Sequence, residues 1–257
     1  MKHVVQRYWS TRIPNLMYSC PGFGDIVHSC LLTYLYGQAH GQPATLHIAS
    51  HQYNRDKPAT WAEVIGLFPP GTVFLQPHKT GDMTDQEFLD LVLAQAPNAE
   101  LHYYKKYPGK LQAPIAPSFW VDDYLVAEKF PCLPATNPGN SIQLPDNFAT
   151  MQMDATSIQR RPTQPQIDQL YKKFADLGCE IVIVGGEATD PALRRAPGAG
   201  YAMSRARYHI GVDSGYLHLA QLYFRPENIY LYTNRDEGKW EHHLKMARDN
   251  GCHINEY

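Results

Sequence analysis

The segment HIGVDSGYLHLAQLY, residues 209–223, combines residue types that can hold an anion. A strand is expected to end at Asp213, and a helix is expected to begin directly after Ser214 and Gly215. The first backbone N–H groups of such a helix and its positive end point at one place, which a glycine lets an anion approach closely. His218 follows one turn later and can donate a hydrogen bond to a phosphate oxygen. The alternative is that Asp213 and Ser214 only cap the helix and that His218 is half-buried with its hydrogen bonds satisfied.

A second group of residues suited to phosphate follows the expected strand FATMQM. Thr156 and Ser157 supply hydroxyl groups, and Arg160 and Arg161 supply guanidinium groups, which match phosphate oxygens in geometry. Both groups follow strands of the same half of the chain. We therefore expect both at the carboxyl edge of one sheet, where open α/β folds bind ligands, and together they favour a phosphate-bearing ligand. The alternative is an ordinary turn followed by two solvated arginines.

The stretch SCPGFGDIVHSCLLTYL, residues 19–35, places a carboxylate between a glycine-rich turn and an apolar helix. Asp25 directly follows Gly22, Phe23 and Gly24. The residues alone favour an N-cap, since an aspartate ahead of a helix stabilises it by about 1 kcal/mol. The two glycines serve as turn residues with positive φ or leave room for a substrate near the backbone.

Short β-like runs alternate with helix-like runs along the whole chain, which predicts an α/β fold with parallel strands and crossover helices. A stretch rich in proline and asparagine at 131–147 has no apolar period and predicts a linker. We expect an N-terminal domain at 1–135 and a C-terminal domain at 136–257. The expected strands are 15–20, 44–50, 71–76, 99–104, 148–155, 180–186, 208–213 and 228–233, and the expected helices are 25–39, 59–67, 84–96, 163–177, 189–195, 214–223 and 239–249.

Composition narrows the class of protein. The chain has 257 residues, 44% of them hydrophobic, and a net charge of −2, so no global basic field attracts nucleic acid or an anionic membrane. Apolar runs are far shorter than a membrane span, and the first residues lack the apolar core of a signal peptide. The five cysteines are scattered without a C-x-x-C pair. These features predict a cytoplasmic protein with reduced thiols.

Four motifs occur in the order seen in another group of proteins: GFGDIVHS, the hydroxyl-plus-basic loop at 156–161, EIVIVGGEATD and GVDSGYLHLA. In this order they resemble the heptosyltransferase-type (family-nine) glycosyltransferases. The resemblance implies two Rossmann-like α/β/α domains facing a cleft, the GT-B type, in a compact form. It also implies that the N-terminal half binds the acceptor and the C-terminal half binds a nucleotide-diphosphate sugar.

The resemblance assigns roles to single residues. Asp25 matches the catalytic aspartate, with Gly22, Phe23 and Gly24 as the acceptor-side loop, and Glu187 matches a position that contacts the nucleotide ribose. The remaining donor-binding positions are Thr156, Ser157, Arg160, Arg161, Asp213, Ser214, Gly215 and His218.

Two departures from the family pattern stand out. The donor signature D-T-G-x-S-H-L reads Asp213, Ser214, Gly215, Tyr216, Leu217, His218, Leu219 here, so Leu217 replaces a serine. The usual lysine is replaced by Arg160 or Arg161, and the sequence leaves open which of them reaches the diphosphate.

The expected activity is inverting hexosyl or heptosyl transfer from a nucleotide-diphosphate sugar to a hydroxyl group of a glycan or other acceptor, with Asp25 as the general base. No metal or other cofactor is expected, because no D-x-D motif is present. One alternative is a glycosyltransferase acting on a modified pyrimidine of DNA, which the mild acidity disfavours. Another is a non-catalytic module that binds a nucleotide or nucleotide sugar.

Overall fold

The computed structural model describes residues 2–7, 23–50, 57–79, 85–97, 100–103, 131–135, 138, 142–155, 160–233, 248 and 251–254. The chain divides into two compact units, Met1–Tyr124 and Leu125–Tyr257. This division falls earlier than the boundary after residue 135 that the linker composition suggested. Leu133 shows why, since its N–H donates to the carbonyl of Leu222 at 2.7 Å within the second unit.

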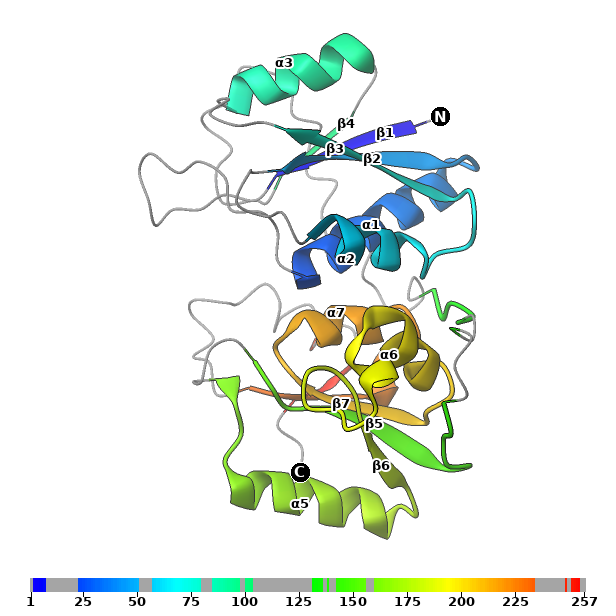
Figure 1. Cartoon of the computed structure of the whole chain (residues 1–257), viewed down its shortest axis with the longest axis vertical. Helices are drawn as coiled ribbons and strands as arrows, with labels where there is room; N and C mark the ends of the chain where they lie inside the picture. Colours follow the sequence, from blue (N-terminus) through cyan, green and yellow to red (C-terminus); the bar gives the residue numbers. More distant parts are fainter. Residues whose placement is uncertain are drawn as a thin grey trace. The chain divides into compact units, whose positions relative to one another are not determined.

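The first unit contains a four-stranded sheet in the order β3-β2-β1-β4, with all strands parallel. Figure 1 shows α1 and α2 on one side of these strands and α3 on the other. The strands are β1 (Lys2–Arg7), β2 (Ala44–Ser50), β3 (Val73–Lys79) and β4 (Glu100–Tyr103), and the helices are α1 (Phe23–Ala39), α2 (Lys57–Ile65) and α3 (Asp85–Gln95).

The two faces of β2 carry different residue types, because successive side chains of a strand point to opposite faces. Ala44 and Leu46 are buried on the face that α1 covers, and a Cβ on Gly37 would lie 3.5 Å from Cβ of Ala44. The opposite face places His47 beside His78 of β3, with 2.9 Å between Nδ1 of His47 and Nε2 of His78. Both rings are buried, and burial lowers the pKa of His78.

The second unit contains a five-stranded parallel sheet in the order β6-β5-β7-β8-β9. Helix α5 lies on one face of it, and α6 and α7 lie on the other (Figure 1). The strands are β5 (Phe148–Gln152), β6 (Glu180–Ile183), β7 (Tyr208–Val212), β8 (Ile229–Tyr232) and β9 (His253–Ile254), and the helices are α5 (Gln164–Asp176), α6 (Ala196–Met203), α7 (Gly215–Ala220) and the 3-10 helices η3 (Pro191–Arg194) and η4 (Pro226–Asn228).

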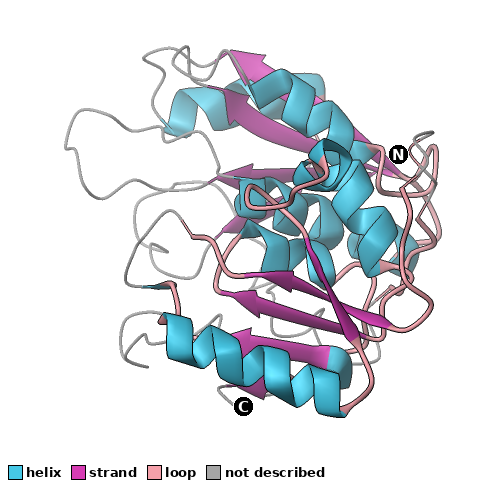
Figure 2. Cartoon of the chain, turned by 60° about the horizontal axis from the view of Figure 1, so that its bottom comes forward, coloured by secondary structure: helices cyan, strands magenta, loops and turns pink. Residues whose placement is uncertain are grey.

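Helix α5 closes the core of the second unit, and Figure 2 shows it running alongside the strands. Leu170 and Phe174 are completely buried, and the Phe174 ring meets Tyr230 of β8 edge-on at 5.0 Å. Tyr171 and Leu177 continue the same i, i+3, i+4 spacing of apolar residues in the sequence but are 41% and 44% exposed. The buried stripe of this amphipathic helix is therefore narrower than its sequence period indicated.

The parallel α/β class predicted from the alternation is confirmed, and two strands and one α-helix of the described part were not predicted. Strand β1 has only two adjacent apolar residues, and β9 has two residues in all. Helix α6 has the sequence APGAGYAM, which is typical of a loop. It is helical because its glycines let neighbouring residues pack closely against it. A Cβ on Gly200, for example, would lie 2.6 Å from the Tyr223 hydroxyl. The strand expected at 15–20 lies outside the described residues, as does the helix expected at 239–249 except for Arg248.

No helix in the described ranges has both the length and the apolar character needed to cross a membrane.

Candidate functional site

The carboxyl edge of the second sheet gathers the segments that follow three adjacent strands. Strand β5 pairs in parallel with β6 on one side and with β7 on the other. The chain therefore leaves all three strands at the same edge. The segments that begin there are 153–155, 184–195 and 213–216. They contain four of the nine predicted donor-site residues, namely Glu187, Asp213, Ser214 and Gly215.

Ser214 connects two of these segments. Its hydroxyl donates to Oε1 of Gln152 at the end of β5, at 2.6 Å, and accepts the N–H of Tyr216 at 3.2 Å. Ser214 is thus the N-cap of α7, as the alternative interpretation of the sequence proposed. The Gln152 side chain is only 4% exposed, and its Nε2 donates to the carbonyl of Asp154.

The two arginines have different positions. Nη1 of Arg160 donates to the carbonyl of Asp213 at 3.0 Å, so this half-buried side chain lies at the end of β7. Arg161 turns back onto its own segment, where Nε donates to the carbonyl of Ala155 at 3.0 Å and Nη2 pairs with the Asp154 carboxylate at 2.6 Å. The structure therefore brings Arg160 to the 213–215 turn and Arg161 to the 154–155 segment.

Tyr216 and Gly185 join the segment after β6 to α7. Gly185 has φ +88°, and a Cβ there would lie 3.2 Å from the Tyr216 ring. The Tyr216 hydroxyl donates to the carbonyl of Arg194 at 2.8 Å, and burial raises the pKa of Tyr216 to about 12. The backbone of this segment can therefore lie directly against the ring.

The other predicted donor-site residues have varied surroundings. Glu187 is exposed, and its charge adds to burial in raising the pKa of Tyr171 on α5. Asp213 and His218 are buried at 7% and 8% exposure, and Gly215 is half-buried. Thr156 and Ser157 lie outside the described residues.

In the first unit, α1 begins at Phe23, two residues before Asp25. The N-cap interpretation of Asp25 is therefore wrong, because the aspartate lies inside the first turn. A carboxylate in that turn interacts favourably with the helix dipole. Phe23 and Gly24 are half-buried, whereas Gly22 and the Asp25 side chain lie outside what the structure describes.

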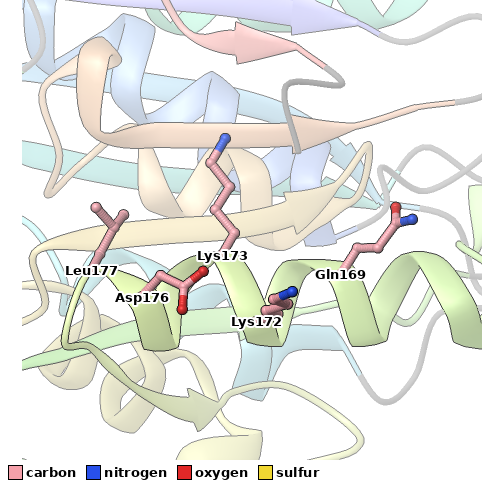
Figure 3. Close-up of a pocket in the computed structure, with 5 residues that line it drawn as sticks. All are labelled: Gln169, Lys172, Lys173, Asp176 and Leu177. Carbon is pink, nitrogen blue, oxygen red and sulfur yellow. The ribbon is translucent and has the colours of Figure 1, made fainter.

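A separate surface pocket of about 510 Å³ lies along the second half of α5. Figure 3 shows its lining, which comes from this helix and its C-cap residue Leu177. Nζ of Lys173 lies 4.8 Å from the centre of the Tyr230 ring. None of the predicted donor-site residues lines this pocket. Its lining residues are Gln169, Lys172, Lys173, Asp176 and Leu177.

The sequence did not lead us to predict Gln152 and Tyr216 as residues at the carboxyl edge of the second sheet. Gln152 carried a usable signal, since an amide at the end of the largely apolar strand FATMQ needs hydrogen-bond partners when buried. Tyr216 occupied a variable position of the expected motif and gave no such signal. Within the described ranges, no three His, Cys, Asp or Glu side chains are grouped so that they can hold a metal ion, and metal independence stays a prediction.

No protein-family model matches the sequence, and neither does any curated protein. Solved structures do match. The crystal structure of a family 9 glycosyl transferase from Veillonella parvula DSM 2008 has 10% identity and a TM-score of 0.50, over 98% of this chain and 84% of that one.

Two structures of the iron-containing dodecameric TibC from enterotoxigenic E. coli H10407 also match, one of them in complex with ADP-D-beta-D-heptose. Both have 11% identity and a TM-score of 0.47, and this chain spans 57% and 58% of their lengths. At identities of 10–11%, a structural match shows a shared fold and nothing more. The predicted resemblance to family-nine glycosyltransferases is confirmed at that level by the Veillonella structure.

We predict that Gly185→Ala destabilises the second unit. An L-residue in the left-handed region costs about 1–2 kcal/mol, and the new Cβ would also lie 3.1 Å from Cγ of Gln152. The matched control is Gly186→Ala, whose Cβ would have no neighbour closer than 3.8 Å. Chemical denaturation should show the loss for Gly185→Ala and a change within about 0.5 kcal/mol for the control. Equal losses in both variants would contradict the packing described here.

Proposed function

We propose that this protein is an inverting, metal-independent glycosyltransferase that moves a sugar from a nucleotide-diphosphate sugar to an acceptor hydroxyl. The observation that carries the proposal is the hydrogen bond from Arg160 to the Asp213 carbonyl, at 3.0 Å. It joins the two predicted phosphate-binding segments at the carboxyl edge of one parallel sheet, which is where open α/β folds bind ligands. The fold shared with a family 9 glycosyl transferase supports the proposal by analogy.

In this proposal the C-terminal domain binds the donor and the N-terminal domain binds the acceptor. A guanidinium group can donate two parallel hydrogen bonds to phosphate oxygens. Arg160 is the better placed of the two arginines, because its guanidinium lies at the 213–215 turn, whereas Arg161 turns back onto the 154–155 segment. The remaining predicted donor contacts keep the roles that the resemblance implies, with Glu187 at the ribose.

The proposed chemical step uses the carboxylate of Asp25. It takes the proton of the acceptor hydroxyl while that oxygen attacks the anomeric carbon of the sugar. The bond from this carbon to the diphosphate oxygen breaks, and its electron pair leaves with the diphosphate. Attack opposite the leaving group inverts the configuration at the anomeric carbon. The positive charge of Arg160 stabilises the charge that develops on the leaving diphosphate.

The acceptor is proposed to be a glycan or another hydroxyl compound, since a net charge of −2 disfavours a nucleic-acid partner. The protein is proposed to act in the cytoplasm. A module that only binds nucleotide sugars would need the same donor-binding residues but no carboxylate at the acceptor side. The role of Asp25 therefore distinguishes that alternative from an enzyme.

The donor class can be tested with a thermal-shift screen of ADP, GDP, UDP, CDP and their sugars, with EDTA present. A ligand that binds only the folded state at about 100 times its Kd adds about 2.7 kcal/mol, so we expect a rise of about 5 °C or more for one nucleotide. The rise should be the same without EDTA. If no nucleoside diphosphate or sugar nucleotide raises the midpoint, the proposed function is wrong.

The chemical role is tested with Asp25→Asn, which preserves size and removes the base. We expect transfer to fall by about 10²–10⁴-fold while donor affinity, measured by calorimetry, stays within about twofold. Asp90→Asn on the exposed side of α3 is the control and should transfer at the normal rate. Unchanged transfer in Asp25→Asn would exclude this aspartate as the base.

The two arginines give a third test. Arg160→Ala should weaken binding of the nucleoside diphosphate found in the screen by about tenfold or more, since a hydrogen bond to a charged group contributes about 1.5–3 kcal/mol. Arg161→Ala should weaken binding less, because its guanidinium lies at the 154–155 segment and not at the 213–215 turn. A larger loss in Arg161→Ala would reverse the assignment.

A further inference from the structure

Gln152 is hydrogen-bonded to two of the segments that leave the carboxyl edge of the second sheet and lies close to the third. It accepts from Ser214 after β7 at 2.6 Å and donates to the Asp154 carbonyl after β5. A Cβ on Gly185 after β6 would lie 3.1 Å from its Cγ. The side chain is buried at 4% exposure, so its amide depends on protein partners for its hydrogen bonds.

The chemistry of these partners fixes where each proton lies. A backbone carbonyl only accepts, so the amide nitrogen of Gln152 must face Asp154 and the amide oxygen must face Ser214. That oxygen also only accepts, so the single hydroxyl proton of Ser214 points at Gln152. The N–H of Tyr216 donates to the same hydroxyl at 3.2 Å. In this arrangement the Ser214 hydroxyl has no proton to donate to a phosphate oxygen.

We propose that Gln152 is the positioning residue of the donor site, holding Ser214 as a structural cap and keeping the three segments in place for binding of a nucleoside diphosphate. The inference rests on the proposed function for the identity of the ligand. It changes the role of Ser214, which supports the site through α7 instead of contacting the diphosphate itself. Direct contact with the diphosphate then falls to charged donors, of which Arg160 is bonded to the residue before Ser214.

Glutamine suits this position better than residues of similar size. Methionine would fill the same space but leave the Asp154 carbonyl and the Ser214 hydroxyl without their partner. An ionised glutamate could accept from Ser214 but could not donate to Asp154, and it would add a negative charge beside an anion site. A protonated glutamate would recover the donor, so the effect of that substitution depends on pH.

The first experiment measures binding of the nucleoside diphosphate from the screen to Gln152→Glu, by calorimetry between about pH 5 and 8. We expect at least tenfold weaker binding than wild type at about pH 8. Burial favours the protonated carboxyl, so the deficit should shrink as the pH falls. The matched control is Gln169→Glu on the exposed side of α5, which should follow the wild-type profile. A deficit that does not change with pH would overturn the inference.

A double-mutant cycle tests the role of Ser214. If its hydroxyl acts through Gln152, adding Ser214→Ala to Gln152→Met should cause little further loss. The affinity of the double variant for the nucleoside diphosphate should then lie within about twofold of that of Gln152→Met alone. If the hydroxyl contacts the diphosphate directly, the two losses should multiply. Multiplied losses would overturn the structural assignment of Ser214.

Hydrogen exchange without any ligand separates this inference from the proposed function. Gln152→Met should lower the protection of the amides in 153–155 and 213–216, and Gln169→Met should leave it unchanged. If wild type binds no nucleoside diphosphate while exchange responds as expected, the proposed function fails and Gln152 remains the residue that holds these segments. If exchange does not respond, the inference fails whatever the protein binds.

Discussion

The parallel pairing of β5 with both β6 and β7 is the constraint on which the second unit depends. Thr150 of β5 lies opposite Val182 on one side and His209 on the other, so the three strands run in the same direction in close register. Every segment that follows them must start at one edge. Residues that are far apart in sequence, such as Gln152 and Ser214, meet there because of strand direction and need no local motif.

Arginines hold these segments by donating to backbone carbonyls. Arg160 bonds Asp213, Arg161 bonds Ala155, and Arg194 bonds Ala188 at 2.7 Å. Each guanidinium has five N–H donors in a rigid plane, so a bond to a carbonyl fixes the orientation of that plane. Under the proposed function, this bond explains how an arginine that stabilises a loop is already oriented when an anion binds. It also explains why counting arginines in the sequence could not rank Arg160 above Arg161.

Strands with continuous apolar runs and helices with strong periodicity were predictable from the sequence, as β6 and α5 show. The meeting of the two predicted phosphate-binding segments was predictable too, because it follows from parallel topology. Helix α6 was not, since its glycines read as a loop and become helical only against Ala192 and Tyr223. The first turn of α1 was also misjudged. Glycines before Asp25 suggested a turn, whereas the helix already includes Phe23 and Gly24.

Compared with the family-nine pattern, the segment 213–219 has fewer hydroxyl groups that can donate a hydrogen bond to a ligand. That pattern offers two hydroxyl residues, and here the second is Leu217, which is buried at 2% exposure. The first is Ser214, whose hydroxyl proton is directed to Gln152. A site built this way cannot rely on hydroxyl donors from this segment to bind phosphate oxygens. Under the proposed function, Arg160 or Arg161 in place of the usual lysine supplies planar charged donors instead, so the two departures from the pattern compensate each other.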